Sequence, residues 1–334
     1  MCRARTTPTR HGMMTASKPV PVRLIVFASP GTVPLEVARA TGLFAAEGLD
    51  VSVEATPSSM YQMAHLIDGD FEIAATAIDN VVAYMEGQGA APTRRPADLR
   101  VFMGSATYRN AFVVAPSIRT FDDLRGRKIA VDALSTGYAF LLRKMLADNG
   151  LTEDDYVFES IGAPAQRWAA VKAGSHVGAL LTDELTEIAV RAGYHAMTSD
   201  PDPWDNYQGN AYVARRDWAE AHRPQLTGFV RAFLRAVRWT LDPANLAALT
   251  TLLKRHLPAI GDDQAAAAAR ALQRPKSILT PDMPLNIPGI RTVLALRSRY
   301  GTPRKALDDP FRYVDLSYYE AARAALAERQ EARR

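Results

Sequence analysis

Residues 21–55 read PVRLIVFASPGTVPLEVARATGLFAAEGLDVSVEA and contain a strand, a helix and a second strand in succession. The run of β-branched and large apolar residues at 22–28 predicts a strand, and the pattern at 33–47 predicts a helix. Gly48 follows this helix, in the position where glycine commonly ends one. A second strand is expected at 50–55. Such a strand–helix–strand unit is typical of α/β domains, so an α/β fold is expected.

The same alternation continues as far as residue 197. Further strands are expected at 71–75, 100–104, 112–115, 127–131, 156–161, 177–181 and 194–197. Helices are expected at 60–68, 77–86, 137–149, 165–173 and 183–192. From residue 218 onward the patterns are helical only, at 224–240, 243–256, 263–273, 288–300 and 318–334. The order predicts two lobes with largely parallel sheets, and an all-helical C-terminal extension packed on lobe one.

A predicted hinge divides the chain. The backbone is expected to cross between the lobes near 105–111 and again near 204–214, and a pair of crossing segments can form a hinge. Lobe one is then discontinuous, with residues 21–105 plus 212–334, and lobe two comprises 106–211. Residues 1–20 are expected to form a flexible basic tail.

The positive charge of the chain lies in this tail. The formal net charge is +4, and the first 18 residues contain four basic residues, Arg3, Arg5, Arg10 and Lys18, and no acidic residue. The remaining chain is therefore close to neutral. A nucleic-acid interface needs a basic stripe with interleaved aromatic residues on a folded face, and the sequence shows none. Nucleic acid is not an expected partner.

The cysteine and histidine residues do not indicate a metal site or a disulfide. Cys2 is the single cysteine, which excludes an internal disulfide and a multi-cysteine site. His65, His176 and His195 lack the spacing of metal ligands relative to other His, Asp or Glu residues. No metal and no cofactor are expected.

Hydropathy gives no membrane span. No segment reaches the 18–20 apolar residues that a spanning helix needs. The basic N-terminus is not followed by a 7–15-residue apolar stretch, so no signal peptide is visible. Direct membrane insertion is not expected, and a cytoplasmic location is an open alternative.

The predicted strand-to-helix turns are rich in small and hydroxyl residues. Ligands of open α/β sheets bind beyond the carboxyl ends of strands, where helix N-termini present free N–H groups. Ser59 with Gln62, and Thr76 with Asp79, have the spacing of capping boxes. The candidate ligand-binding residues are Ser29, Gly31, Thr32, Ser58, Ser59, Asp79, Asn80, Arg109, Ser135, Thr136, Gly137, Tyr138, Ala163, Gln166 and Asp183.

Each candidate also has a purely structural interpretation. A Ser or Thr at a helix start is an ordinary cap. Asp79 could meet a ligand amine or hydroxyl group, or it could only stabilise the helix dipole. Arg109 could bind an anion through both guanidinium arms or be a solvated hinge residue. Tyr138 could line the cleft or belong to the core.

Three sequence blocks carry a family resemblance. The first is ATGLFAAEGLD (40–50) within the stretch 22–87, the second is FDDLRGRKIAV (121–131), and the third is AYVARRDW (211–218). In this order they resemble the nitrate/sulfonate/taurine-type periplasmic substrate-binding proteins, a superfamily that includes the thiamine-pyrimidine-precursor proteins. The resemblance covers roughly residues 21–250 and does not extend to the helices beyond Pro258.

The resemblance implies a type II periplasmic-binding-protein fold and the capture of a small organic ligand, anionic or heteroaromatic, for an ABC importer. It implies ligand contacts at 29–32, at Ser58, Ser59 and Asp79, at 135–138 and at 163–166. It also implies a periplasmic location, a permease as a partner and a monomeric protein that is not an enzyme.

Two alternatives remain open. The first is an enzyme on the same fold, such as a cofactor-free decarboxylase, a desulfinase-like enzyme or one with pyrimidine-precursor chemistry. Relatives of these kinds use cysteine or histidine, whereas here Asp79 or Asp183 would have to act with His65 or His176. The second is a cytosolic ligand sensor that signals through the terminal helix at 318–334.

Overall fold

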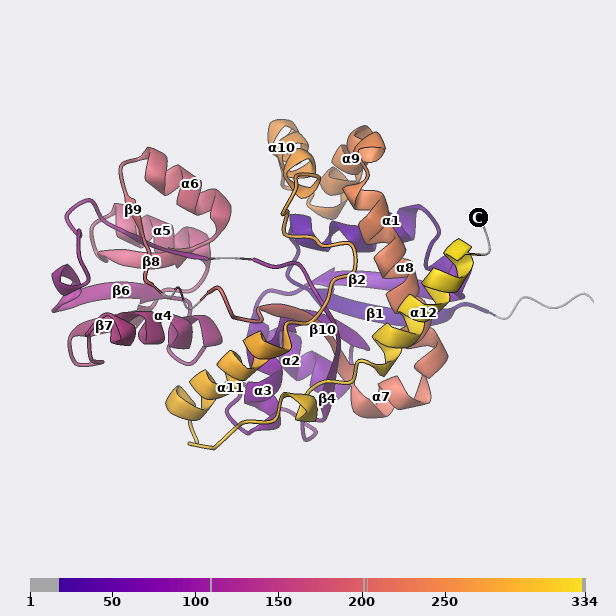
Figure 1. The fold of residues 1–334 in the computed structure, drawn as a ribbon, viewed down its shortest axis with the longest axis horizontal. Helices are drawn as coiled ribbons and strands as arrows, with labels where there is room; N and C mark the ends of the chain where they lie inside the picture. The colour runs from indigo at the N-terminus through magenta and orange to yellow at the C-terminus, as the bar shows by residue number, and fades with distance from the viewer. Residues whose placement is uncertain (1–17, 109, 201, 203, 332–334) are drawn as a thin grey trace, which may run out of the picture.

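The computed structural model describes residues 18–108, 110–200, 202 and 204–331, and these form two five-stranded sheets (Figure 1). The first sheet has the strand order β2-β1-β3-β10-β4 and the second has β7-β6-β8-β5-β9. Figure 1 shows the second sheet with its helices at one end of the molecule, the second half, and the first sheet with most of the C-terminal helices at the other end, the first half. The expected two-lobed α/β fold is confirmed. The exact lobe boundaries, 21–105 plus 212–334 and 106–211, stay a prediction.

The first sheet is mixed rather than parallel throughout. Its strands are β1 (Val20–Val26), β2 (Leu49–Ala55), β3 (Ile73–Ala77), β4 (Leu99–Gly104) and β10 (Asn210–Arg215). β1 pairs in parallel with β2 and β3, but β10 lies antiparallel between β3 and β4. The chain returns from the second sheet through β10, and this return strand enters the middle of the first sheet. Because β4 is also antiparallel to β10, four of the five strands run in the same direction, and the expectation of a largely parallel sheet holds for this half except at β10.

Helices cover both faces of the first sheet. The side chains of Leu24 and Val26 pack on one face, and Ile25 packs on the other, as strand alternation requires. The first face is covered by α1 (Val33–Ala40), α8 (Arg223–Leu241), α9 (Leu246–His256), α10 (Asp262–Leu272) and α12 (Ser317–Glu331). The second face is covered by α2 (Ser59–Asp68), α3 (Ile78–Met85) and α11 (Ile287–Tyr300). The C-terminal helices thus pack on the first sheet, as the sequence predicts.

The second sheet has the same layered construction. Its strands are β5 (Ala111–Val114), β6 (Arg127–Val131), β7 (Tyr156–Ser160), β8 (Gly178–Leu181) and β9 (His195–Met197). One face packs on α4 (Gly137–Asp148), and the other packs on α5 (Pro164–Lys172) and α6 (Asp183–Arg191). β5 is antiparallel to both of its neighbours, β8 and β9, because it receives the chain from the first sheet.

The helix predicted at 33–47 is interrupted. α1 ends at Ala40, and Gly42 adopts a φ of 71°, which lets the Leu43 N–H bond to the Ala38 carbonyl. A 3₁₀ turn, Ala45–Glu47, follows, and Gly48 ends it in the left-handed conformation, as expected. The helix predicted at 243–256 likewise begins with a 3₁₀ turn, Pro243–Asn245. Short 3₁₀ turns also occur at Pro30–Thr32, Asp122–Leu124 and Pro310–Arg312, and a short helix α7 at Arg216–Ala221.

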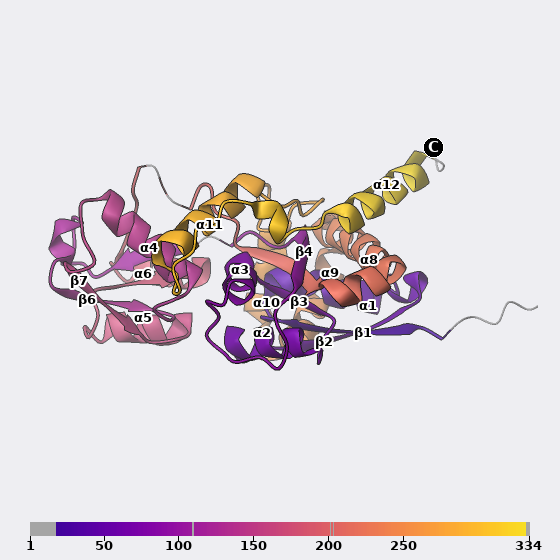
Figure 2. The ribbon, with the colours of Figure 1, turned by 90° about the horizontal axis from the view of Figure 1, so that it is seen from below.

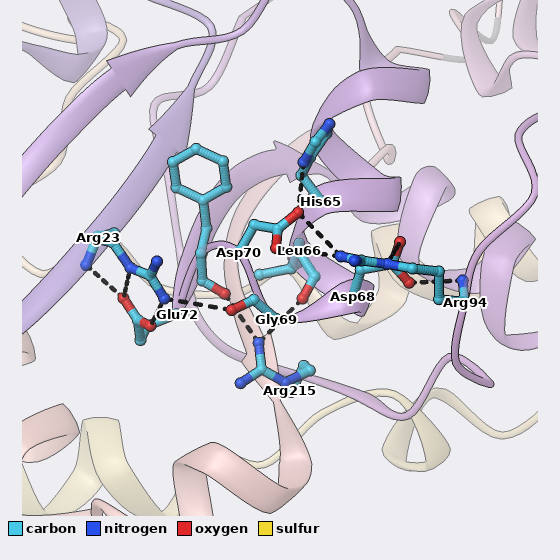
Figure 3. Close-up of polar contacts among 10 residues, drawn as sticks. Arg23, His65, Leu66, Asp68, Gly69, Asp70, Glu72, Arg94 and Arg215 are labelled. Carbon is cyan, nitrogen blue, oxygen red and sulfur yellow. Dashed lines mark hydrogen bonds and ion pairs between the residues drawn. The ribbon is translucent and has the colours of Figure 1, made fainter.

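Ion pairs tie the start of β3 to its surroundings (Figure 3). Arg23 of β1 binds Glu72, and Arg94 binds both Asp68 and Asp70. His65 at the end of α2 lies 2.6 Å from Asp70. This cluster sits where β3 begins, whereas Asp79 follows the opposite end of that strand. His65 is therefore not placed to act together with Asp79.

In the described part of the chain, three segments join the two halves. The backbone crosses within 105–108 and within 204–209, close to the predicted crossings. In addition, α11 packs against α3 of the first half and α4 of the second, and Figure 2 shows it extended along both. Leu296 of α11 is buried with Phe140 and Leu141 of α4. Among the described residues, no helix combines the length and apolarity that a membrane crossing requires.

Candidate ligand-binding site

The loop after β1 is held in shape by its own hydroxyl groups. Thr32 Oγ1 donates to the Ser29 carbonyl over 2.9 Å and accepts from the Ser29 N–H over 3.1 Å. The loop then enters α1 through Pro34, whose fixed φ suits a first helical turn. Ser29, Gly31 and Thr32 therefore lie together at the carboxyl end of β1, as predicted.

Tyr108, in the first crossing segment, contacts this loop. Its phenol oxygen lies 2.6 Å from Ser29 Oγ and accepts the Gly31 N–H over 3.1 Å. A Cβ on residue 31 would lie only 2.7 Å from the Cβ of Ala106, so the close approach requires glycine there. The crossing segment thus covers two of the donors expected to bind a ligand. Sequence reasoning missed Tyr108.

His256 at the end of α9 supports the same loop. Its Nε2 lies 2.8 Å from Thr32 Oγ1. Because the Thr32 hydroxyl hydrogen goes to the Ser29 carbonyl, His256 Nε2 is assigned as the donor to Thr32 Oγ1, which requires a proton on Nε2. Burial lowers the pKa of His256 to about 4, in agreement with a neutral ring.

A hollow of about 120 Å³ adjoins His256. Its polar lining includes an ion pair, in which Arg39 lies 2.6 Å from Glu36. The hollow is lined by Val26, Ala28, Glu36, Arg39, Val53, Ala55, Arg255 and His256.

The turn before α2 departs from its predicted capping. Ser58 is the cap, because its Oγ accepts the Tyr61 N–H over 3.1 Å, and Ser59 is the first residue of the helix. The predicted Ser59–Gln62 box is wrong. Gln62 is buried and donates to the carbonyls of Ile25 and Ala75, which joins α2 to two strands.

The turn before α3 connects the two halves. The predicted Thr76–Asp79 box is wrong, because Ala77 precedes the helix and Thr76 Oγ1 instead accepts from Asn80 over 3.0 Å. Asp79 accepts from Arg297 of α11, with 2.5 Å between Asp79 Oδ1 and Arg297 Nε. Its second oxygen, Oδ2, accepts the Gly137 N–H of α4 over 2.8 Å. Asp79 is thus fully engaged within the protein.

The turn between β6 and α4, in the second half, forms the other side of the contact with Asp79 and Arg297. Thr136 caps α4 by accepting the Ala139 N–H over 3.2 Å, and it donates to Asp132 over 2.8 Å. Burial raises the pKa of Asp132. The Ser135 carbonyl accepts from Arg297 over 3.0 Å. Tyr138 packs its ring against those of Trp204 and Tyr207, at centroid distances of 5.8 and 6.0 Å.

The remaining candidate ligand-binding residues either act as helix caps or have side chains that lie outside the described residues. The Ala163 N–H donates to Gln166 Oε1 over 3.0 Å, so this glutamine side chain acts as a cap. Neighbouring Arg167 is buried and donates to the Leu180 and Gly162 carbonyls. Asp183 begins α6 after β8, but its side chain lies outside the described residues, as does the whole of Arg109. His176 binds Glu159 and Ser175.

Large apolar side chains are exposed at the same turns, which the sequence did not reveal. Phe27 follows β1 and is 45% exposed, Met60 in the first turn of α2 is 50% exposed, and Leu134 before α4 is 48% exposed. These residues come from both halves and stand beside the N–H groups of helix starts. A ligand that meets these turns can therefore be apolar in part. The described residues contain no group of three or more His, Cys, Asp and Glu side chains arranged to hold a metal ion.

Comparisons with known proteins agree with this architecture. A model of the NMT1-like family matches residues 15–254, which is more than half of the chain. The chain belongs to the NMT1-like family. Among curated relatives of this NMT1-like protein, the bicarbonate transport ATP-binding protein CmpC of Synechococcus elongatus is 27% identical over 263 residues. That match covers 74% of this chain but only 39% of CmpC, so the chain spans well under half of its relative.

Solved structures share the fold of the NMT1-like protein. The periplasmic nitrate-binding protein NrtA from Synechocystis PCC 6803 gives a TM-score of 0.72 at 15% identity, covering 92% of this chain and 89% of NrtA. The periplasmic aliphatic sulphonate binding protein SsuA from Escherichia coli gives 0.59 at 22% identity, covering 77% and 80%. The desulfurization enzyme DszB gives 0.61 at 14% identity, covering 91% and 99%. At these identities the likeness shows the fold, and the fold includes an enzyme.

Proposed function

We propose that the protein is a solute-binding protein that holds a small organic anion with an apolar or aromatic body between its two halves. One observation carries the proposal: the N-terminal turns of α3 and α4, from different sheets, meet with 2.8 Å between Asp79 Oδ2 and the Gly137 N. The strand-end turns of both sheets therefore face a common region, where ligands of open α/β sheets bind.

The chemistry of these turns favours an anion with an apolar body. The Ser29 hydroxyl and the Gly31 N–H suit carboxylate, sulfonate or sulfinate oxygens once the Tyr108 hydroxyl, which contacts both in this arrangement, is displaced. Phe27, Met60 and Leu134 provide exposed apolar surface beside them. Asp79 is neutralised by Arg297, so it does not repel an anion as a free carboxylate would.

Delivery to an ABC importer, with a permease as partner, belongs to the same proposal. CmpC is named as a transport protein, and NrtA and SsuA are named as periplasmic binding proteins. By this likeness we propose a periplasmic location and a monomer. An enzyme receives less support, because His65 lies with Asp70 at the opposite end of β3 from Asp79, and His176 precedes β8 whereas Asp183 follows it.

Thermal shift and isothermal titration against a defined panel test the proposal. The panel contains nitrate, bicarbonate, butanesulfonate, benzoate and biphenyl-2-sulfinate. A ligand present at about 100 times its Kd is expected to stabilise the fold by about 2.7 kcal/mol. Leu134→Asp should weaken binding of any organic member that stabilises, whereas Thr152→Ala, an exposed hydroxyl bonded to Asp155, is the control. Consumption of a panel member on prolonged incubation, followed by chromatography, would instead indicate the enzyme.

A further inference from the structure

One residue of helix α11, Arg297, makes polar contacts with both halves of the protein. Arg297 lies near the C-terminal end of this helix, and its side chain is 3% exposed, as is that of Asp79. Nε donates to Asp79 Oδ1 over 2.5 Å, and Nη2 donates to Asp79 Oδ2 and, over 3.0 Å, to the Ser135 carbonyl. A single guanidinium group thus binds α3 of the first half and the turn before α4 of the second.

The two turns also bind one another directly. The Gly137 N–H donates to Asp79 Oδ2, the same oxygen that accepts from Arg297. Gly137 is the first residue of α4, so its N–H is one that the helix itself leaves unpaired. The carboxylate of Asp79 therefore occupies the positive end of α4 while Arg297 fixes its orientation.

Glycine at 137 is required by closeness, not by backbone conformation. A Cβ at this position would lie 2.7 Å from the Cβ of Asp79, and the Tyr207 hydroxyl would also be too close. Its φ is not among the positive values found for other glycines, so alanine would fit α4 itself. The absence of a side chain serves the contact between the two halves.

A buried hydroxyl group without a hydrogen-bond partner in the described structure lies next to the contact between Asp79 and Gly137. The Tyr207 hydroxyl is buried beside Gly137 and has no hydrogen-bond partner among the described residues. A buried unpaired hydroxyl is unfavourable, so this arrangement of the two halves carries a cost at Tyr207. Tyr207 belongs to the second crossing segment, so a change in the angle between the halves would change the surroundings of its hydroxyl group.

We propose that Arg297 is a positioning residue of the binding site, which holds Asp79 against the N-terminus of α4 and thereby sets the resting angle between the two halves. In this arrangement α11 is a third connection besides the two crossing segments. The angle then depends on Arg297, Asp79 and Gly137, none of which needs to touch the ligand. The proposal goes beyond solute binding, and it is tested without a ligand, so the two can fail separately.

Pulsed electron–electron double resonance measures the distance between two spin labels. With one label on each half, this distance reports the angle between the halves. The background is Cys2→Ser with Glu54→Cys on β2 and Asp154→Cys after α4, two exposed positions on different halves. Arg297→Lys removes the forked contact but keeps the charge, and its matched control is Arg299→Lys, the same change at an exposed site on the same helix. We expect Arg297→Lys to shift and broaden the distance distribution, and Arg299→Lys to leave it unchanged.

Gly137→Ala is a second variant, which keeps the proposal testable if Arg297→Lys does not fold. Alanine favours α4 as a helix, and it leaves Asp79 and Arg297 in place within the first half. The added methyl group should separate the halves, so the distance distribution should shift while circular dichroism stays the same. Unchanged distributions in both Arg297→Lys and Gly137→Ala would overturn the proposal. If Arg297→Lys does not fold, the result for Gly137→Ala decides alone.

Discussion

Gly137 donates its backbone N–H to the Asp79 carboxylate across 2.8 Å, although the two residues lie 58 positions apart and belong to helices that pack on different sheets. Arg297, a further 160 positions along the chain (297 − 137), binds the same carboxylate. Three distant parts of the sequence therefore meet at the point where the two halves touch. Substitutions at this contact and at the loop after β1 therefore test the main features of the structure.

The buried ion pair should be sensitive to removal of one partner. Asp79→Asn leaves the Arg297 guanidinium buried without its counter-charge, which typically costs about 3–5 kcal/mol. We expect urea denaturation to show a loss of this size, and the double variant Asp79→Asn with Arg297→Met to recover part of it. Asp122→Asn, which changes a carboxylate that is 78% exposed, serves as the control. Equal stability for Asp79→Asn and Asp122→Asn would contradict the structure.

Tyr108 should compete with an anionic ligand for the loop after β1. Its hydroxyl uses Ser29 Oγ and the Gly31 N–H, and a net hydrogen bond contributes about 1 kcal/mol. Tyr108→Phe is therefore expected to tighten binding of the best anion of the panel by about fivefold in isothermal titration. Tyr84→Phe removes a hydroxyl that accepts the Ala91 N–H in the first half and is the matched control. Weaker binding by Tyr108→Phe would show that the phenol contacts the ligand instead of competing with it.

His256 should make stability depend on pH. Its pKa is about 4 in the folded protein and about 6.5 in the unfolded chain, so the unfolded state binds more protons between these values. The stabilisation is complete above pH 6.5 and is lost as the pH falls toward 4, by roughly 2–3 kcal/mol. His256→Gln should remove this part of the pH dependence in denaturation curves measured from pH 7 to pH 4. A curve for His256→Gln parallel to that of the wild type would refute the assignment.

The exposed apolar residues should matter for binding but not for folding. Phe27→Ser removes a ring that is 45% exposed, so the melting temperature should change little. Binding of benzoate or biphenyl-2-sulfinate should weaken, whereas binding of nitrate, which has no apolar body, should not. Phe311→Ser, at a ring that is 59% exposed on the helical extension, controls for loss of any surface aromatic. Equal losses for nitrate and the aromatic anions would count against an apolar contact.

Much of the fold could be predicted because its signals are local. Strand runs such as 127–131 and helix starts such as Thr136 appear in the sequence as short patterns, and the structure has β6 and α4 there. The break of α1 at Gly42 was also visible in principle, since glycine favours the left-handed conformation found there. The antiparallel insertion of β10 was not visible, because strand order depends on contacts between distant segments.

The candidate site shows where sequence reasoning stops. Sequence reasoning identified Asp79 and Gly137 as possible ligand contacts because they lie at helix starts. In the structure, Asp79 instead binds Gly137 and Arg297. Tyr108 and His256 were missed because each reaches the loop after β1 from a distant element, 77 and 224 positions away from its partner there. No periodic pattern records such contacts. Whether the turns also bind a ligand stays a prediction.

The most direct measurement is the distance between spin labels at Glu54 and Asp154 with and without the panel anion that stabilises the protein most. A ligand held by turns from both halves must favour one arrangement of them, so its addition at saturation should shorten and narrow the distance distribution. If titration shows saturated binding while the distribution stays the same, the ligand is not bound between the halves, and the proposed function is wrong.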